Sequence, residues 1–526
     1  MPSNTEWESS MVLGLFGKKS DHPLADIKNV QHLLDDLPKS DSLKALHELS
    51  EWMEDLREPG NGFRADHQWA VLRLLDQAAQ GHVRKVWHDY FAPQPLTKFQ
   101  ENRLWSLLDA FYTQSELCHF ELLGRYREGD KGAAAIKLDL PFLCARGVAA
   151  ITGRLKLAVA RFALVDPALW KHLAVFYMFA EGQDFNHTPI AMYANVQTSV
   201  AQEMAVLIAW YGSCSGNTNQ LPGHITERLL SYLGKGLKLS ASYNGAGLFV
   251  FDLAQPTPPM FAISDATIHP ALRYVEVEEI RQPLENLIKT LEKGIAPDAL
   301  NFYGVTYEME MVCDIARGLL KSIVLPPPAR KNPRRKINVN LQIANGFHRM
   351  LEQSDFGLRL GAAESDTWEV QDISATGFRC VVSLSRNDAG GVGEGLKIGS
   401  LIGSKAENVS QWGAAIVRRL RRDEQGKLHI GVEVLSPRIV VMPLLDRSKL
   451  GSEKYLIGLY LNRPNDASGE AWLVIKPETF SGSRTLEMQL NDKNYLLMPL
   501  ALIERGDDYD LARYRMMEQD ASASEE

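Results

Sequence analysis

The stretch from Pro326 to Lys336 divides the chain into two parts with different sequence patterns. Its three consecutive prolines favour the extended polyproline II conformation, which has no internal hydrogen bonds. Before this stretch, apolar residues recur at helical spacing. After it, short runs rich in β-branched and aromatic residues alternate with turn residues. Because 526 residues are also too many for one hydrophobic core, the sequence predicts a multidomain α+β protein.

Changes in pattern along the chain set the expected domain boundaries. We predict a flexible tail over residues 1–22, a mainly α-helical N-terminal scaffold over 23–325 with a β-like insertion near 237–277, β-rich modules over 326–440 and 441–517, and a disordered acidic tail over 518–526. Within the scaffold, periodicity predicts helices that include Lys98–Leu123, Pro283–Glu292 and Val305–Leu320. In the first β-rich module, Leu396–Ile402 is expected to be a strand, and Ala414–Leu420 and Leu428–Val434 a hairpin.

Three arginines follow the prolines, at Arg330, Arg334 and Arg335. A guanidinium group stays charged, presents a planar fork of donors that suits phosphate, and stacks on flat rings. Because the polyproline stretch is not expected to lock them in a helix, these side chains could close over an anionic ligand. The pattern indicates a local anion-binding segment.

The second motif is the turn Asp372-Ile-Ser374-Ala-Thr-Gly377, which the strand-like runs Trp368–Asp372 and Phe378–Ser383 enclose. The carboxylate can accept hydrogen bonds from a guanine edge, and the short hydroxyl can donate one. The glycine permits a φ that a residue with a Cβ would resist, and lets a ligand approach the backbone. Taken alone, the same pattern is typical of an ordinary polar turn.

Together, Arg330-x-x-x-Arg334, the turn from Asp372 to Gly377 and the run Ile430–Val434 resemble the PilZ domain family. That resemblance covers residues 326–440 and implies a small β-barrel that binds the bacterial second messenger cyclic di-GMP. It implies that Arg330 and Arg334 hold the phosphates and guanine faces, with Arg335 as an auxiliary. It also implies that Asp372, Ser374 and Gly377 line the barrel side of the site. By family analogy, the output is pilus- or flagellum-based motility, surface attachment or biofilm formation.

The C-terminal module, 441–517, has no Arg-x-x-x-Arg motif followed by an Asp-x-Ser-x-x-Gly turn, so any second barrel there lacks the ligand-binding groups. The sequence also lacks signatures of the enzymes that make or degrade cyclic di-GMP. We therefore expect a receptor without catalytic residues, metal or cofactor, which relays its ligand to an unidentified protein partner, for example one of the pilus or flagellar machinery.

Other features of the sequence exclude some classes of function. The segment Gly212–Gly216 superficially resembles a cysteine nucleophile elbow, but helical spacing precedes it and Pro222 interrupts the helix that should follow. The five cysteines show no metal-binding spacing, and reduced, buried thiols are the expected state. No apolar window is long enough for a membrane span, so a cytoplasmic protein is expected.

Two alternatives to the receptor remain open. In the first, the barrel binds no nucleotide and only organises protein partners. In the second, it is a nucleic-acid-binding module, since small barrels with basic edges bind single strands. Residues 326–440 contain more Lys and Arg than Asp and Glu, whereas the chain as a whole carries a net charge of −8. A single basic module in an acidic protein favours a local anionic ligand, and DNA is not expected.

Overall fold

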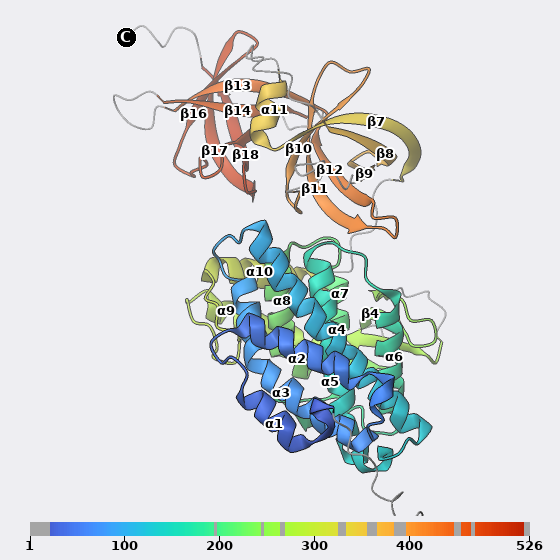
Figure 1. Ribbon diagram of the computed structural model, residues 1–526. Helices are drawn as coiled ribbons and strands as arrows, with labels where there is room; N and C mark the ends of the chain where they lie inside the picture. Colours follow the sequence, from blue (N-terminus) through green and yellow to red (C-terminus); the bar gives the residue numbers. More distant parts are fainter. Residues whose placement is uncertain are drawn as a thin grey trace, which may run out of the picture. The chain divides into compact units, whose positions relative to one another are not determined.

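The protein is described from a computed structural model, which places residues 22–193, 197–242, 247–262, 269–324, 333–354, 366–382, 396–446, 454–463 and 469–519. The described residues form two compact units. One holds most of the chain up to residue 324 and is mainly helical, and the other holds most of the chain from residue 333 and is built of strands (Figure 1). The expected succession of a helical and a β-rich region is therefore confirmed.

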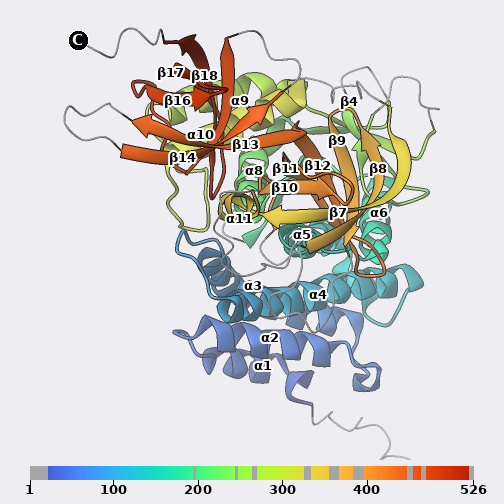
Figure 2. The same cartoon turned by 90° about the horizontal axis from the view of Figure 1, so that it is seen from above.

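The helical unit is an array of amphipathic helices around one large core. Its helices are α1 (Ile27–Asp35), α2 (Ser42–Leu56), α3 (Ala65–Tyr90), α4 (Lys98–Glu128), α5 (Leu140–Ala160), α6 (Pro167–Gly182), α7 (Val200–Cys214), α8 (Gln220–Leu233), α9 (Glu278–Leu291) and α10 (Met309–Val324). The long helix α4 begins at a capping box, in which Thr97 and Gln100 exchange side-chain and backbone hydrogen bonds. It packs against α2, α3 and α5, and Figure 2 shows α1 to α4 running side by side.

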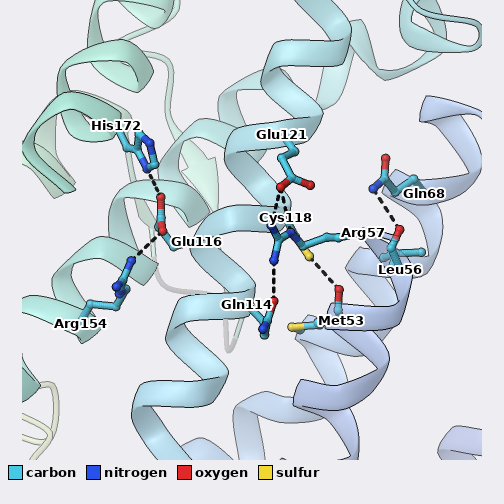
Figure 3. A network of polar contacts seen from close by, with 10 residues as sticks. All are labelled: Met53, Leu56, Arg57, Gln68, Gln114, Glu116, Cys118, Glu121, Arg154 and His172. Carbon is cyan, nitrogen blue, oxygen red and sulfur yellow. Dashed lines mark hydrogen bonds and ion pairs between the residues drawn. The ribbon is translucent and has the colours of Figure 1, made fainter. Parts of the chain in front are cut away.

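Polar side chains of α4 are closed into pairs with neighbouring helices (Figure 3). Arg57, at the end of α2, donates from Nε to Glu121 at 3.0 Å. Glu116 is fully buried and accepts a hydrogen bond from Arg154 of α5 at 3.0 Å, while its other oxygen contacts His172 of α6. Each buried charge here has a partner of opposite sign, which offsets its loss of hydration.

Several helices differ from the sequence-based expectation. Helix α4 continues past Leu123 to Glu128, and α9 begins at Glu278, five residues before Pro283. Pro222 does not interrupt a helix but lies in the first turn of α8, where a missing backbone N–H costs no helical hydrogen bond. The helix expected from Val305 begins at Met309. Cys214 is the last residue of α7 and is buried, so a helix, not a strand, precedes the Gly212–Gly216 segment.

A four-stranded sheet completes the helical unit, in the order β3 (Lys238–Ser240), β6 (Leu272–Glu276), β4 (Gly247–Asp252) and β5 (Met260–Phe261). A two-residue pair, β1 (Ile190–Ala191) and β2 (Gln197–Thr198), precedes α7. Phe249 and Phe251 of β4 are almost fully buried and join the helical core. Throughout the described residues, no helix has both the length and the apolar character that crossing a bilayer requires.

The β unit contains two closed six-stranded barrels among its described residues. The first has the strand order β10-β11-β12-β9-β8-β7, with β7 (Arg335–Asn345), β8 (Asp366–Ser374), β9 (Gly377–Val382), β10 (Leu401–Ala406), β11 (Gly413–Arg422) and β12 (Leu428–Ser436). Its interior is filled by apolar side chains such as Trp368, Cys380 and Ile430. The strand expected at Leu396–Ile402 is shorter and begins only at Leu401. The hairpin of β11 and β12 is as expected.

The second barrel has the order β13-β14-β15-β18-β17-β16, with β13 (Arg438–Asp446), β14 (Lys454–Asn462), β15 (Glu470–Ile475), β16 (Leu486–Leu490), β17 (Lys493–Arg505) and β18 (Asp510–Glu518). Apolar side chains from all six strands fill it. A third apolar cluster joins the two barrels, through the short helix α11 (Phe347–Gln353), Trp412 of the first barrel and Tyr509 before β18. The two barrels therefore share an interface core.

Candidate ligand-binding site

The turn between β8 and β9 holds two of the expected site residues. Ser374 and Gly377 are directly paired across the hairpin, and the Ser374 hydroxyl donates to the Gly377 carbonyl at 3.0 Å. The backbone N–H of Val434 in β12 donates to the Thr376 carbonyl at 3.0 Å, which fixes the turn to the next strand. The hydroxyl therefore closes the turn in the free protein.

Gly377 is required for a different reason from the one the sequence suggested. It does not have the left-handed φ that we expected from a glycine in this turn. Instead, a Cβ at this position would lie 2.2 Å from the carbonyl oxygen of Val432 in β12. The glycine allows the close pairing of β9 with β12, and this packing holds the turn beside the outer surface of the barrel.

A β-bulge directs Asp372 to the outer face of the barrel. Val370 pairs with Cys380, and both side chains point into the core, but Gln371 is an extra residue in β8, so Asp372 pairs with Arg379. Arg379 lies between the core residues Phe378 and Cys380 and therefore faces outward. The bulge thus places the Asp372 carboxylate among the outward side chains, although only 10% of that side chain is exposed.

Two guanidinium groups hold the Asp372 carboxylate. The Nη1 of Arg334 lies 3.1 Å from its Oδ1, and the Nε of Arg379 lies 2.8 Å from its Oδ2. These contacts have the distances of ion pairs, but neither Oδ1 nor the Arg379 Nε has a well-aligned hydrogen bond among the described residues. The carboxylate is therefore charge-compensated but retains capacity to accept hydrogen bonds.

The strand register also places the other basic residues of this region. Arg335, the first residue of β7, is opposite Ile373, whereas Lys336 is directly opposite Asp372. Arg330 lies outside the described residues. The structure thus brings together Arg334, Asp372, Ser374 and Gly377. Three cationic residues, Arg334, Arg379 and Lys336, surround the single Asp372 carboxylate.

Sequence reasoning missed Arg379 and Lys336 as members of this site. Lys336 ends the proline- and arginine-rich stretch, and Arg379 lies in the run that follows the Asp372–Gly377 turn. Their proximity to Asp372 depends on pairing across β7, β8 and β9 and on the bulge at Gln371. Simple alternation along β8 would have placed Asp372 on the same face as Trp368 and Val370. No local sequence signal marks the bulge.

Comparison with known proteins finds a similarity in the other unit. Residues 28–241 match the family model described as cyclic-di-GMP receptor FimW, N-terminal domain. The matched segment runs from α1 to the end of β3 and covers about two fifths of the chain. It does not include either barrel. No curated protein matches the chain.

Proposed function

We propose that the protein is a non-catalytic receptor for cyclic di-GMP and that the outer face of the first barrel around Asp372 binds it. The observation that carries the proposal is the Asp372 carboxylate, which is held on this face between Arg334 and Arg379. The similarity of residues 28–241 to the N-terminal domain of a cyclic-di-GMP receptor supports the same ligand independently of the barrel.

The proposed site matches the chemistry of a guanine dinucleotide. The Asp372 carboxylate accepts hydrogen bonds from the N–H groups of a guanine edge, and the arginines at 330, 334 and 335 bind phosphate and stack on the bases. When the ligand binds, its phosphate pairs with the Arg334 guanidinium, which leaves Asp372. The guanine edge then donates hydrogen bonds to the Asp372 carboxylate in place of that guanidinium. The exchange leaves each charged group with a partner, so binding does not leave a buried charge unpaired.

In this proposal, the protein relays ligand binding to a partner. Transfer of the Arg334 guanidinium from Asp372 to the ligand phosphate changes the start of the segment that links the β unit to the helical unit, and this change is the signal. The output, by analogy with the PilZ family, is pilus or flagellar motility, surface attachment or biofilm formation through a cytoplasmic protein partner. No metal or cofactor takes part.

Calorimetric titration of cyclic di-GMP into the intact protein tests the proposal. We expect wild-type protein to bind, and Arg334→Ala and Asp372→Asn each to weaken binding at least tenfold, about 1.4 kcal/mol. Arg515→Ala, at an exposed arginine of the second barrel, is the matched control and should bind as the wild type does. GTP should not displace the dinucleotide.

Two results would overturn the proposal. Absence of binding by folded protein would leave the barrel as a scaffold for other proteins. Binding of oligonucleotides that weakens steeply with salt, in place of cyclic di-GMP, would indicate a nucleic-acid-binding module.

A further inference from the structure

The segment from Arg418 to Arg422 in β11 contains four arginines and one leucine, and its side chains lie in three different environments. Arg418 is the extra residue of a bulge and contacts Glu433 at 2.8 Å and Glu504 at 2.6 Å, so carboxylates compensate its charge. Leu420 points into the barrel core. Arg419 and Arg421 are exposed. Carboxylates thus hold Arg418, whereas Arg419 and Arg421 face solvent.

Pairing across four neighbouring strands aligns Arg419 with the candidate site. Asp372 in β8 pairs with Arg379 in β9, Arg379 with Gly431 in β12, and Gly431 with Arg419 in β11. Directly paired residues share a face of the sheet, and the flanking residues Ile430 and Val432 point into the core. These four positions, which we name the outer row, therefore cross the outside of the barrel in one line.

Gly431 gives the side chain of Arg419 room to lean along the outer row. It has no side chain, and the stem of Arg419 lies beside it, with the Arg419 Cβ 3.1 Å and Cγ 3.6 Å from where a Cβ on Gly431 would be. Adjacent strands are about 4.8 Å apart, so Arg379 and Arg419 stand about 10 Å apart at their backbones. A planar or ring-shaped ligand could lie across the outer row on the Arg419 stem that covers Gly431, between the two guanidinium groups.

The charges of the outer row differ from one end to the other. Arg379 is within ion-pair distance of Asp372. Among the residues that the structure describes, by contrast, the Arg419 guanidinium has no carboxylate partner. The end of the row at Arg419 is thus a cationic group with free donors, displaced from the Arg334–Asp372 pair along the same face.

We propose that Arg419 forms a second phosphate subsite on this face, and that it selects ligands carrying two separated phosphates over those with one. The inference rests on the proposed function and deepens it: Arg334 binds one phosphodiester of a cyclic dinucleotide, and Arg419 binds the other across Gly431. A mononucleotide, with a single phosphate, reaches only the first subsite. Arg419 is then a specificity-determining residue that no motif marks.

Titrations of cyclic di-GMP and of 5′-GMP into the full-length protein and three variants test this inference. We expect Arg419→Ala to weaken cyclic di-GMP binding about tenfold, the loss of a charge-assisted hydrogen bond, and to leave 5′-GMP binding unchanged. Arg419→Lys should recover part of the affinity because it keeps the charge but not the fork. Arg421→Ala, two residues along the same strand, is the matched control, with cyclic di-GMP affinity within twofold of the wild type.

The possible outcomes separate this inference from the proposed function. If the wild type and Arg419→Ala bind cyclic di-GMP equally while Arg334→Ala does not bind, the receptor stands and the second subsite is wrong. An equal loss for both nucleotides in Arg419→Ala would show a general effect on the barrel, and would also contradict the selectivity. If the wild type binds no cyclic di-GMP, the receptor and the subsite both fall.

Discussion

At Gly377, a single added carbon atom would disturb the packing of the site. The Val432 carbonyl, 2.2 Å from the position of a Cβ, is backbone within a paired strand and cannot turn aside as a side chain would. We expect Gly377→Ala to lower the free energy of unfolding by about 1–3 kcal/mol. Urea denaturation of the intact protein, followed by tryptophan fluorescence, measures the change.

A matched glycine provides the control for this prediction. Gly482 lies between β15 and β16 of the second barrel. A Cβ added there would have no atom within 4 Å, and its φ is not left-handed. Gly482→Ala should therefore change the free energy of unfolding by less than about 0.5 kcal/mol. Equal effects of the two substitutions would show that the contact with Val432 does not determine the requirement for glycine.

His224 in the helical unit makes stability depend on pH. Its ring is stacked between Phe91, at a centroid distance of 3.9 Å, and Tyr303, at 5.5 Å, and neither ring nitrogen has a hydrogen-bond partner among the described residues. Burial, followed by the neighbouring charge of Lys156, lowers the pKa of His224 well below its ordinary value of 6.5. The folded protein therefore holds this imidazole neutral, whereas the unfolded chain protonates it.

This difference fixes the sign of the pH dependence. Below pH 6.5 the unfolded state binds a proton that the folded state does not, so the free energy of unfolding falls as the pH decreases, by up to about 1.4 kcal/mol per pH unit for this group. We expect thermal unfolding between pH 7 and 5 to show a smaller decrease in Tm for His224→Phe than for wild type. His47→Gln, at an exposed histidine, should leave the wild-type slope, and an unchanged slope for His224→Phe would refute the assignment.

At the scale of elements, the contact between the two barrels depends on a bulge in β11. Arg418 there reaches Glu504 of β17 with both terminal nitrogens, at 2.7 and 2.6 Å, and Tyr509 donates to the same carboxylate at 3.1 Å. Because Arg418 is about one third exposed, solvent weakens the pair relative to a fully buried one. We expect Arg418→Ala to destabilise the β unit by about 1–2 kcal/mol.

A double-mutant cycle with Glu504→Gln measures the coupling within this pair by denaturant unfolding. The exposed pair Lys397 and Asp507 also has its charged atoms 3.0 Å apart and serves as the comparison, with an expected effect of less than about 0.5 kcal/mol for Lys397→Ala. If the Arg418–Glu504 coupling is no larger than that of the exposed pair, the bidentate contact does not hold the barrels together.

The elements that the sequence predicted best are those with uninterrupted local patterns. The hairpin of β11 and β12 follows alternating apolar residues on both sides of a turn signal. Strand β13 was missed because Pro443 lies within it, and proline in a run usually argues against a strand. Strand β18 was missed because charged residues alternate along it, and only its pairing with β15 and β17 closes the barrel.

The candidate site was predictable only in part for a related physical reason. The motif residues Asp372, Ser374 and Gly377 are close in sequence, so a turn brings them together without long-range information. Arg379 and Arg419 reach the same face through strand pairing and two bulges, each of which changes the phase of alternation. Sequence periodicity along one strand cannot indicate such a change, because the extra residue is recognised only from the pairing with the partner strand, where it has no counterpart.

At the scale of the whole molecule, the family similarity and the proposed site lie in different units. The match covers residues 28–241 of the helical unit, whereas Arg334 and Asp372 belong to the β unit. Each unit has apolar cores of its own, and the β unit also includes the short segments Phe162–Leu164 and Ser215–Asn219. The location of the ligand site is therefore open to a direct test with fragments.

We expect the fragment 325–526 to bind cyclic di-GMP with an affinity within about threefold of the full chain, or 0.7 kcal/mol, because all the proposed ligand-binding groups are within it. The fragment 1–324 should not bind. Circular dichroism establishes first that each fragment is folded, strand-rich in one case and helical in the other, and calorimetry then measures binding. Arg334→Ala in the β fragment is the internal control and should weaken its binding at least tenfold. Binding by the folded helical fragment alone would move the site to the unit that resembles the receptor's N-terminal domain, and the ion pairs around Asp372 would then serve only to hold β7 against the barrel.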